Sequence, residues 1–95
     1  MKFDKIIHEP ARLRIMMILA GLEQADFTFL VTTLSLTRGN LNRHMEKLES
    51  AGYLKVKRSF KGKVRNTSYQ LTQKGSKALA QYWENLDAVR RLGQS

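Results

Sequence analysis

The sequence predicts an α+β domain that is mostly helical, with its elements in the order helix, helix, helix, strand, strand, helix. Two observations lead to this prediction. Apolar residues recur at helical spacing in the first half of the chain and again near its end, whereas just after Gly52 they alternate with polar residues as in a half-buried strand. With 95 residues, and with no internal repeat or linker, the chain is expected to form a single domain over 1–95.

The first helix is expected to begin near Pro10. Proline suits a first helical turn because it lacks only an N–H group that would be unpaired there. The helix should end at Gly21 or shortly after. Its apolar positions repeat at helical spacing, and they are Ile15, Ile18, Leu19 and Leu22.

A short second helix is expected in the segment ADFTFLVTTLSL. Either Asp26 or Thr28 can serve as its N-cap, because both side chains accept hydrogen bonds from a free helical N–H. An alternative places Phe27 in a minimal strand. The expected apolar positions of this helix are Phe29, Leu30 and Leu34.

The third predicted helix carries most of the functional signal. Thr37 can cap it, it runs to Ser50 or Ala51, and Gly52 supplies the left-handed turn that ends it. At about 100° per residue, its buried side carries Leu41, Met45 and Leu48. The opposite side is polar throughout, with Gly39, Arg43, Glu46 and Ser50 near its centre and Asn40, Asn42 and Lys47 at its edges.

Two alternating runs after Gly52 predict a β-hairpin with the segment KGKVR at its tip. The first run, YLKVKRSF, puts Leu54, Val56 and Phe60 on one face, and the second, NTSYQLT, puts Thr67, Tyr69 and Leu71 together. A final helix is then expected over 73–91, with Thr72 as its cap.

The charge of the chain is large and unevenly placed. The formal net charge is +9, and residues 36–66 alone hold nine Lys and Arg against two Asp and Glu. A basic excess confined to one supersecondary unit indicates a surface for a polyanion. A solvated surface that promotes solubility is the alternative interpretation.

The composition also narrows the function class. The chain has no Cys, which excludes disulfides, thiolate metal sites and thiol redox chemistry. No apolar run approaches the roughly 20 residues of a membrane span, and the N-terminal residues do not form a signal peptide. We therefore expect a soluble cytoplasmic protein with no membrane partner.

The polar face of the third helix has the residue types that read DNA. Asn and Arg can form paired hydrogen bonds with adenine and guanine edges, and here they lie in the first two turns, which reach the bases when a helix points into the major groove. Arg43 is interpreted as a base or groove contact, Arg38 as a phosphate contact and Lys47 as a backbone contact. Gly39 would permit close backbone approach, although a plain helix-start glycine is equally compatible. His44 is expected to be a packing residue.

Basic residues surround the predicted hairpin tip, and no acid accompanies them. Such residues are suited to the DNA backbone or the minor groove, where Lys and Arg gain by releasing counterions. For Lys55 we favour the other role of lysine on an edge strand, protection against edge-to-edge aggregation. The candidate DNA contacts of the hairpin are Lys57, Arg58, Lys61, Lys63 and Arg65.

The order of elements and four segments resemble small stand-alone winged-helix transcriptional regulators of the MarR/ArsR-like group. The segments are HEPARLRIMMIL, DFTFL, LTRGNLNRHMEKLESAGYLKV and YQLTQKG, and the resemblance covers residues 6–85. It implies a dimeric regulator of double-stranded DNA, most simply a repressor, with helix 37–51 in the major groove and hairpin 57–66 as the wing. It places the DNA contacts at Thr37, Arg38, Asn40, Asn42, Arg43 and Lys47 in the helix and at Lys61, Lys63 and Arg65 in the wing.

The chain departs from this group in two respects. Metal-sensing members use Cys or His/Asp clusters that this chain lacks, so neither a metal nor a cofactor is expected. The chain also lacks the additional helical length that encloses a ligand pocket in larger MarR-like dimers. Whether a small-molecule effector exists is left open.

The last predicted helix offers a seam for a homodimer. Its apolar residues Leu79, Tyr82, Leu86 and Val89 follow the three-and-four spacing of paired helices. We favour pairing with a second copy, assisted by Phe3, Ile6 and Ile7 of the N-terminal segment. The alternative is that the seam folds onto its own domain.

Three other functions are alternatives to DNA binding. An enzyme is not expected, because His8 and His44 lie on different elements and the chain has no glycine-rich phosphate loop or metal-ligand cluster. A module for protein contact within a transcription complex is the main alternative, since a fold alone does not determine function. RNA binding is disfavoured because Phe60 and Tyr69 are expected to face inward, which leaves no exposed aromatic along the basic unit.

Overall fold

The computed structural model describes residues 2–94 and confirms the predicted fold class and order of elements. One short strand is added between the first two helices. The elements are α1 (Pro10–Ala20), β1 (Ala25–Asp26), α2 (Phe27–Leu34), α3 (Arg38–Ser50), β2 (Leu54–Lys61), β3 (Val64–Leu71) and α4 (Gln73–Leu92).

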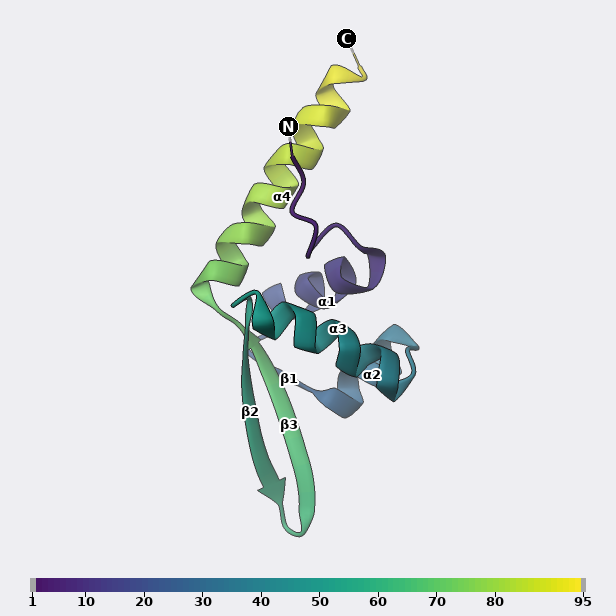
Figure 1. Cartoon of the computed structure of the whole chain (residues 1–95), viewed down its shortest axis with the longest axis vertical. Coiled ribbons are helices and arrows are strands. Elements are labelled where there is room, and N and C mark those ends of the chain that lie inside the picture. The colour runs from purple at the N-terminus through teal and green to yellow at the C-terminus, as the bar shows by residue number, and fades with distance from the viewer. Residues whose placement is uncertain (1, 95) are drawn as a thin grey trace.

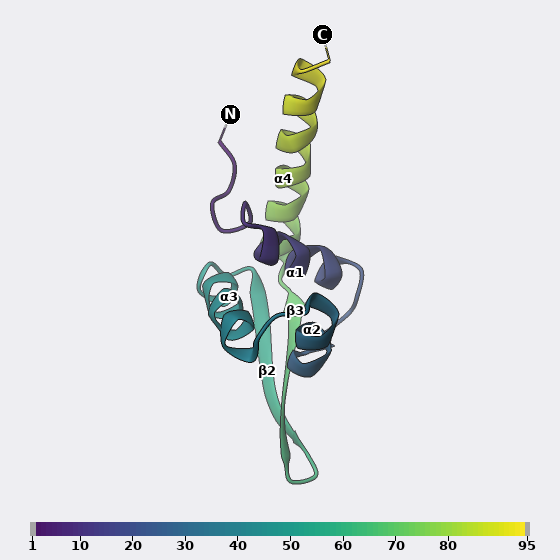
Figure 2. The same cartoon turned by 90° about the vertical axis from the view of Figure 1, so that its right-hand side faces the viewer.

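The molecule is elongated, with extents of 58 × 26 × 21 Å. The helices α1, α2 and α3 form its middle, the β2–β3 hairpin projects from one end and α4 from the other (Figures 1 and 2). The three strands are antiparallel in the order β1-β3-β2, so β3 is central. The N-terminal segment meets α4 where Asn85 Nδ2 donates to the Lys2 carbonyl at 3.2 Å.

The core lies where the three middle helices meet the base of the hairpin and the first half of α4. Its members that are almost completely buried are Ile7, Ile15, Met16, Leu19, Leu30, Leu41, Met45 and Leu48. Leu54, Tyr69, Leu79 and Tyr82 extend it into the hairpin and α4. The predicted buried side of α3 is thereby confirmed.

Two details of the first helices differ from the prediction. Leu22 is exposed because α1 ends at Ala20, before Leu22 can continue the helical stripe. Phe29 is also exposed, since the eight-residue α2 buries only a narrow stripe of Leu30 and Leu34. Asp26 is the N-cap of α2, with its carboxylate accepting from the Phe29 N–H at 2.8 Å, and the minimal strand lies just before Phe27 rather than including it.

The structure of the hairpin contradicts the prediction that Phe60 faces inward, and this bears on function. Phe60 does not face the core but is 68% exposed. The outer part of the hairpin extends beyond the helices that could cover it (Figure 2). Tyr69 is buried as predicted. The tip is also tighter than expected, since pairing continues to Lys61 and Val64 and the turn contains only Gly62 and Lys63. Phe60 therefore supplies the exposed aromatic whose expected absence disfavoured RNA binding.

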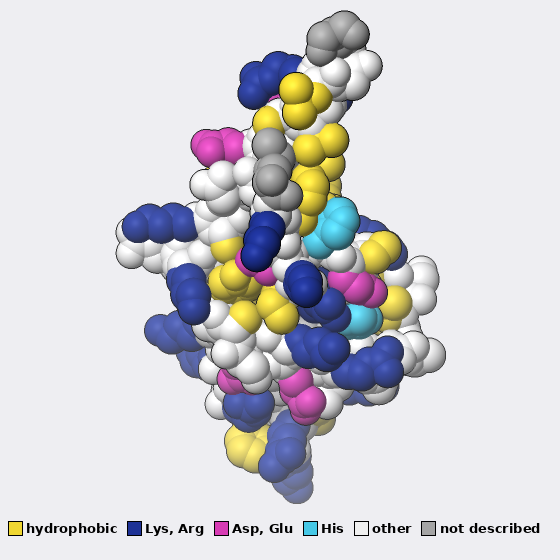
Figure 3. Space-filling view, turned by 45° about the horizontal axis from the view of Figure 1, so that its top comes forward, with side chains coloured by type: hydrophobic (Ala, Val, Ile, Leu, Met, Phe, Trp, Pro, Cys, Tyr) yellow, Lys and Arg dark blue, Asp and Glu magenta, His cyan; other side chains and the backbone are white. Residues whose placement is uncertain are grey.

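The seam of α4 is divided between the domain and its surroundings. Leu79 and Tyr82 are buried in the core of this chain, as is Ile7. The prediction that these three side chains contact a second copy is therefore wrong, because each is already covered within its own domain. Leu86 and Val89 are 39% and 44% exposed on the projecting part of the helix. In Figure 3 hydrophobic side chains gather on this upper part of the molecule, whereas most Lys and Arg side chains on that face lie lower.

Candidate nucleic-acid interface

Local sequence positions α3 with its polar face outward. Thr37 caps the helix, because its hydroxyl oxygen accepts from the Asn40 N–H at 3.1 Å. Leu41 and Leu48 are fully buried beneath the helix, which leaves the opposite face in solvent. The exposed residues of α3 other than apolar ones are Arg38, Gly39, Asn40, Asn42, Arg43, Glu46, Lys47, Glu49 and Ser50.

The exposed side chains of α3 make only weak contacts with one another. Asn42 donates to Glu46 at 3.1 Å and Arg43 donates to Asn40 at 3.4 Å. Such exposed hydrogen bonds are easily exchanged for bonds to another partner, since water competes for the same groups. Gly39 has open space around it, with no heavy atom within 4 Å of the position that a Cβ would take.

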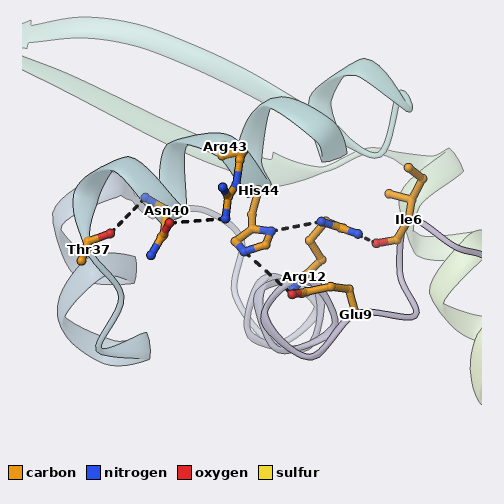
Figure 4. A network of polar contacts seen from close by, with 7 residues as sticks. All are labelled: Ile6, Glu9, Arg12, Thr37, Asn40, Arg43 and His44. Atoms are coloured by element: carbon orange, nitrogen blue, oxygen red, sulfur yellow. Dashed lines mark hydrogen bonds and ion pairs between the residues drawn. The ribbon is translucent and has the colours of Figure 1, made fainter.

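The back of α3 is held by a buried polar network (Figure 4). Arg12 of α1 donates through Nε to the Ile6 carbonyl at 2.5 Å and through a terminal nitrogen to Nδ1 of His44 at 3.1 Å. Because arginine can only donate, Nδ1 must accept, so His44 is neutral in this arrangement. Its other ring nitrogen lies 3.9 Å from the Glu9 carboxylate. His44 is thus a packing residue, as predicted, and it ties α3 to α1.

The same network shifts two pKa values. Burial lowers the pKa of His44, and the nearby charges of Arg12, Arg43 and Lys47 lower it further against the opposing effect of Glu9. Burial raises the pKa of Glu9, but the Arg12 N–H, the positive charge of the His44 ring when it is protonated, the Ala11 N–H and the charge of Arg12 together lower the pKa overall. Both groups therefore favour neutral His44 beside ionised Glu9.

Three arginines converge between the start of α3 and the hairpin. Arg38, Arg58 and Arg65 line one pocket of about 280 Å³ together with Asn42. The guanidinium of Arg38 lies over the ring of Phe27, 4.8 Å from its centroid, so a cation–π contact orients it. The pocket is otherwise lined by Thr28, Asn66, Thr67 and Tyr69, without a carboxylate. An excess of positive charge lining one pocket suits an anionic ligand.

The hairpin separates the basic residues that the sequence grouped together. Residues paired across the strands share a face, so Arg58 with Thr67, and Phe60 with Arg65, lie on the face that turns toward α3. Lys57 and Lys61 alternate onto the opposite face, and Lys63 lies in the turn. The sequence alternation already indicated that Arg58 lies on the same strand face as Leu54. The strand register was needed to show that Arg65 lies on that face too.

Within residues 2–94, no group of three or more His, Cys, Asp or Glu is arranged to hold a metal ion. No helix in the same range is long and apolar enough to cross a membrane.

A family model for the winged helix DNA-binding domain matches residues 11–89, from α1 through most of α4. The chain belongs to this winged helix family. In the terms of the family, β2–β3 is the wing. The match includes both α3 and the wing, so it covers every residue of the three-arginine pocket.

The chain is 40% identical over 79 residues to the uncharacterized protein MJ0432 of Methanocaldococcus jannaschii, which covers 82% of this chain and 85% of that protein. It is similar in structure to a transcriptional regulator homologue from Pyrococcus horikoshii, with a TM-score of 0.84 and 30% identity over 90% of this chain and 85% of the other. The winged helix fold also matches a MarR mutant from E. coli, solved with operator DNA, with a TM-score of 0.69 and 20% identity over 78% of this chain and 52% of MarR.

Proposed function

We propose that this winged-helix protein is a transcriptional regulator that binds specific sites in double-stranded DNA, with α3 in the major groove and the wing on the backbone or in the minor groove. One observation carries the proposal. The polar face of α3 and the inner face of the wing meet at a pocket lined by three arginines and no acid. The similarity to the Pyrococcus transcriptional regulator homologue and to MarR solved with operator DNA supports it.

The residues of α3 divide into two roles in this proposal. Asn40, Asn42 and Arg43 read base edges, because they are exposed in the first two turns and carry the groups that pair with adenine or guanine. The remaining proposed contacts of the helix, Thr37, Arg38 and Lys47, position the helix against phosphates.

The wing residues are ranked by the face on which they lie. Arg58 and Arg65 face the same pocket as Arg38, so they are the wing contacts nearest to the strand held by α3. The lysines of the wing, Lys57, Lys61 and Lys63, serve flanking phosphates from the opposite face or the tip.

We also propose that the protein binds as a homodimer through the projecting part of α4. Leu86, Val89 and Trp83 leave 38–44% of their surface exposed there, an arrangement that a second copy can cover. Phe3 and Ile6 pack partly against the core, and the Phe3 ring lies 5.5 Å from the ring of Tyr82 in the middle of this helix, so the two residues can extend the contact. Two-fold pairing would present two α3 helices to half-sites about one helical turn apart.

We propose repression as the mode of regulation. A protein that occupies a site on DNA excludes other proteins from it, and this needs no surface beyond the DNA contacts themselves. A reporter gene placed behind a selected binding site tests this: expression should rise when the protein is removed, whereas an activator would show a fall.

The test of DNA binding is fluorescence anisotropy with a mixed-sequence duplex as salt is raised, alongside the matching single strand. Contacts from α3 and the wing should make log K fall with log salt by about 0.9 for each phosphate neutralised, giving a slope of several units. Duplex should bind more tightly than single strand. Absence of duplex binding at low salt would refute the proposal and favour a protein-contact role instead.

A further inference from the structure

Phe60 is exposed at a place where the sequence pattern predicts a core residue. Its side chain is 68% exposed, while the other apolar members of the same strand face, Leu54 and Val56, are buried or half-buried. The strand alternation therefore continues past the end of the core and carries an aromatic ring into solvent near the wing tip.

The surroundings of Phe60 are strongly basic. The cross-strand partner of Phe60 is Arg65, and Arg58 lies two residues before it on the same face. All three residues line one hollow at the outer part of the wing, together with Ser59, Asn66 and Thr67. The sequence contains no Asp or Glu between Glu49 and Glu84. An apolar ring between two guanidinium groups fits a polyanion that also has apolar surface.

Nucleic acid has that combination, since each phosphate backbone runs beside sugars and stacked bases. Proteins that bind the minor groove combine Arg or Lys on the backbone with an apolar side chain pushed between bases. The face that bears Phe60 also bears Arg58 and Arg65, which line the pocket beside α3. When α3 occupies the major groove, this face is turned toward the same duplex.

We propose that Phe60 is a DNA-contacting residue that enters the minor groove and partly unstacks a base step while Arg58 and Arg65 hold the flanking phosphates. The proposal rests on the DNA-binding function proposed above and adds a preference that α3 does not supply. Pyrimidine–purine steps such as TA unstack most easily, so a flexible step under the wing should be favoured.

Val64 provides a matched control. Its side chain is 69% exposed at the same wing tip, but it pairs with Lys61 and lies on the opposite face from Phe60. Truncating either exposed side chain should leave folding intact, so Val64→Ala shows the effect of removing an exposed apolar group from the opposite face of the same wing tip, although the group removed is smaller than the ring of Phe60. Phe60→Trp retains an aromatic ring at the proposed site.

The experiment uses the full chain and a duplex of alternating TA steps in which 2-aminopurine replaces some adenines. Unstacking increases the fluorescence of this base. The wild-type protein should increase it on binding, Phe60→Trp and Val64→Ala should do the same, and Phe60→Ala should not. Phe60→Ala should also weaken duplex binding by roughly 5-fold to 150-fold, the range of alanine substitutions at base-stacking aromatics.

The salt dependence separates this apolar contact from the charged ones. Phe60→Ala should leave the slope of log K against log salt unchanged because it removes no charge, whereas Arg65→Ala should reduce the slope by about one. Normal duplex binding with no effect of Phe60→Ala on affinity or fluorescence would refute the proposed insertion of Phe60 between bases, but it would not contradict the regulator function. Absence of duplex binding by the wild-type protein would overturn both. Tighter Phe60-dependent binding to single-stranded RNA than to duplex DNA would also refute this insertion and would indicate that Phe60 stacks on an unpaired base.

Discussion

The junction between α4 and the start of β2 depends on a glycine. A Cβ atom at Gly75 would lie 2.3 Å from the carbonyl oxygen of Tyr53, and about 3.0 Å is the shortest separation that real Cβ contacts show. The contact must therefore lengthen by at least about 0.7 Å, which moves the helix away from the strand because both sides are backbone. At the same junction the Thr72 N–H donates to the Tyr53 carbonyl at 3.0 Å, and the Thr72 hydroxyl donates to the Gly52 carbonyl at 2.6 Å.

The expected cost of Gly75→Ala follows from these contacts. Overpacking against a fixed backbone costs about 1–3 kcal/mol, and weakening one hydrogen bond adds about 1 kcal/mol. Replacing glycine within a helix returns up to about 1 kcal/mol. The free energy of unfolding should therefore fall by about 1–3 kcal/mol, which corresponds to a drop in Tm of roughly 4–8 °C for each kcal/mol.

Urea unfolding followed by circular dichroism measures this effect. The midpoint should fall while the m-value stays constant. The matched control is Gly39→Ala at the start of α3, where no atom lies within 4 Å and the added methyl group should stabilise the free protein by up to about 1 kcal/mol. A Gly75→Ala variant as stable as the wild type would refute the close approach of α4 to β2.

Four further outcomes are expected. Arg43→Ala should reduce the preference for a selected site by about 1–3 kcal/mol, whereas Lys63→Ala should weaken binding to all duplex sequences alike. Competition binding with cognate and random DNA measures both effects, and equal losses of affinity for the two DNAs would show that Arg43 does not contact bases. Gly39→Ala should weaken DNA binding despite stabilising the free protein, as an anisotropy titration would show, if the helix backbone approaches DNA closely. Leu86→Glu should shift the protein from dimer to monomer in light scattering; an unchanged mass would place the dimer contact elsewhere. Because the pKa of His44 is lower in the folded state than its ordinary value of 6.5, neutral His44 should stabilise the fold above pH 6.5. This stabilisation should be lost as the pH falls from 6.5 toward the lower pKa of the folded state, since the unfolded chain then binds more protons. Urea midpoints across this range should show that loss, and His44→Gln should remove it.

Much of the fold was predictable because its signals are local. Thr37 and Thr72 cap their helices as predicted, since the side-chain oxygen and the free N–H groups are three residues apart. Gly52 adopts the expected left-handed turn, with φ of 82°. The buried side of α3 followed from helical periodicity alone.

The errors occurred where burial depends on how far an element extends. Phe60 continues the apolar pattern of β2, but the hairpin projects beyond the helices that could cover it (Figure 1). Periodicity shows which side of an element is apolar, and it contains no information about where the neighbouring element ends. Ile7 shows the converse error, because a residue expected to contact a partner is fully buried in this chain.

The sequence by itself determined the element types, the polar outer face of α3 and the concentration of positive charge in α3 and the wing. These depend on residue type and on spacings of a few positions, which the chain order displays directly. Only the tertiary structure decided which charges share a surface. Arg38, Arg58 and Arg65 are up to 27 positions apart and meet in one pocket, whereas Lys57 and Lys61 turn away from it. The physical reason is that strand register and helix packing are set by long-range burial, which no local spacing encodes.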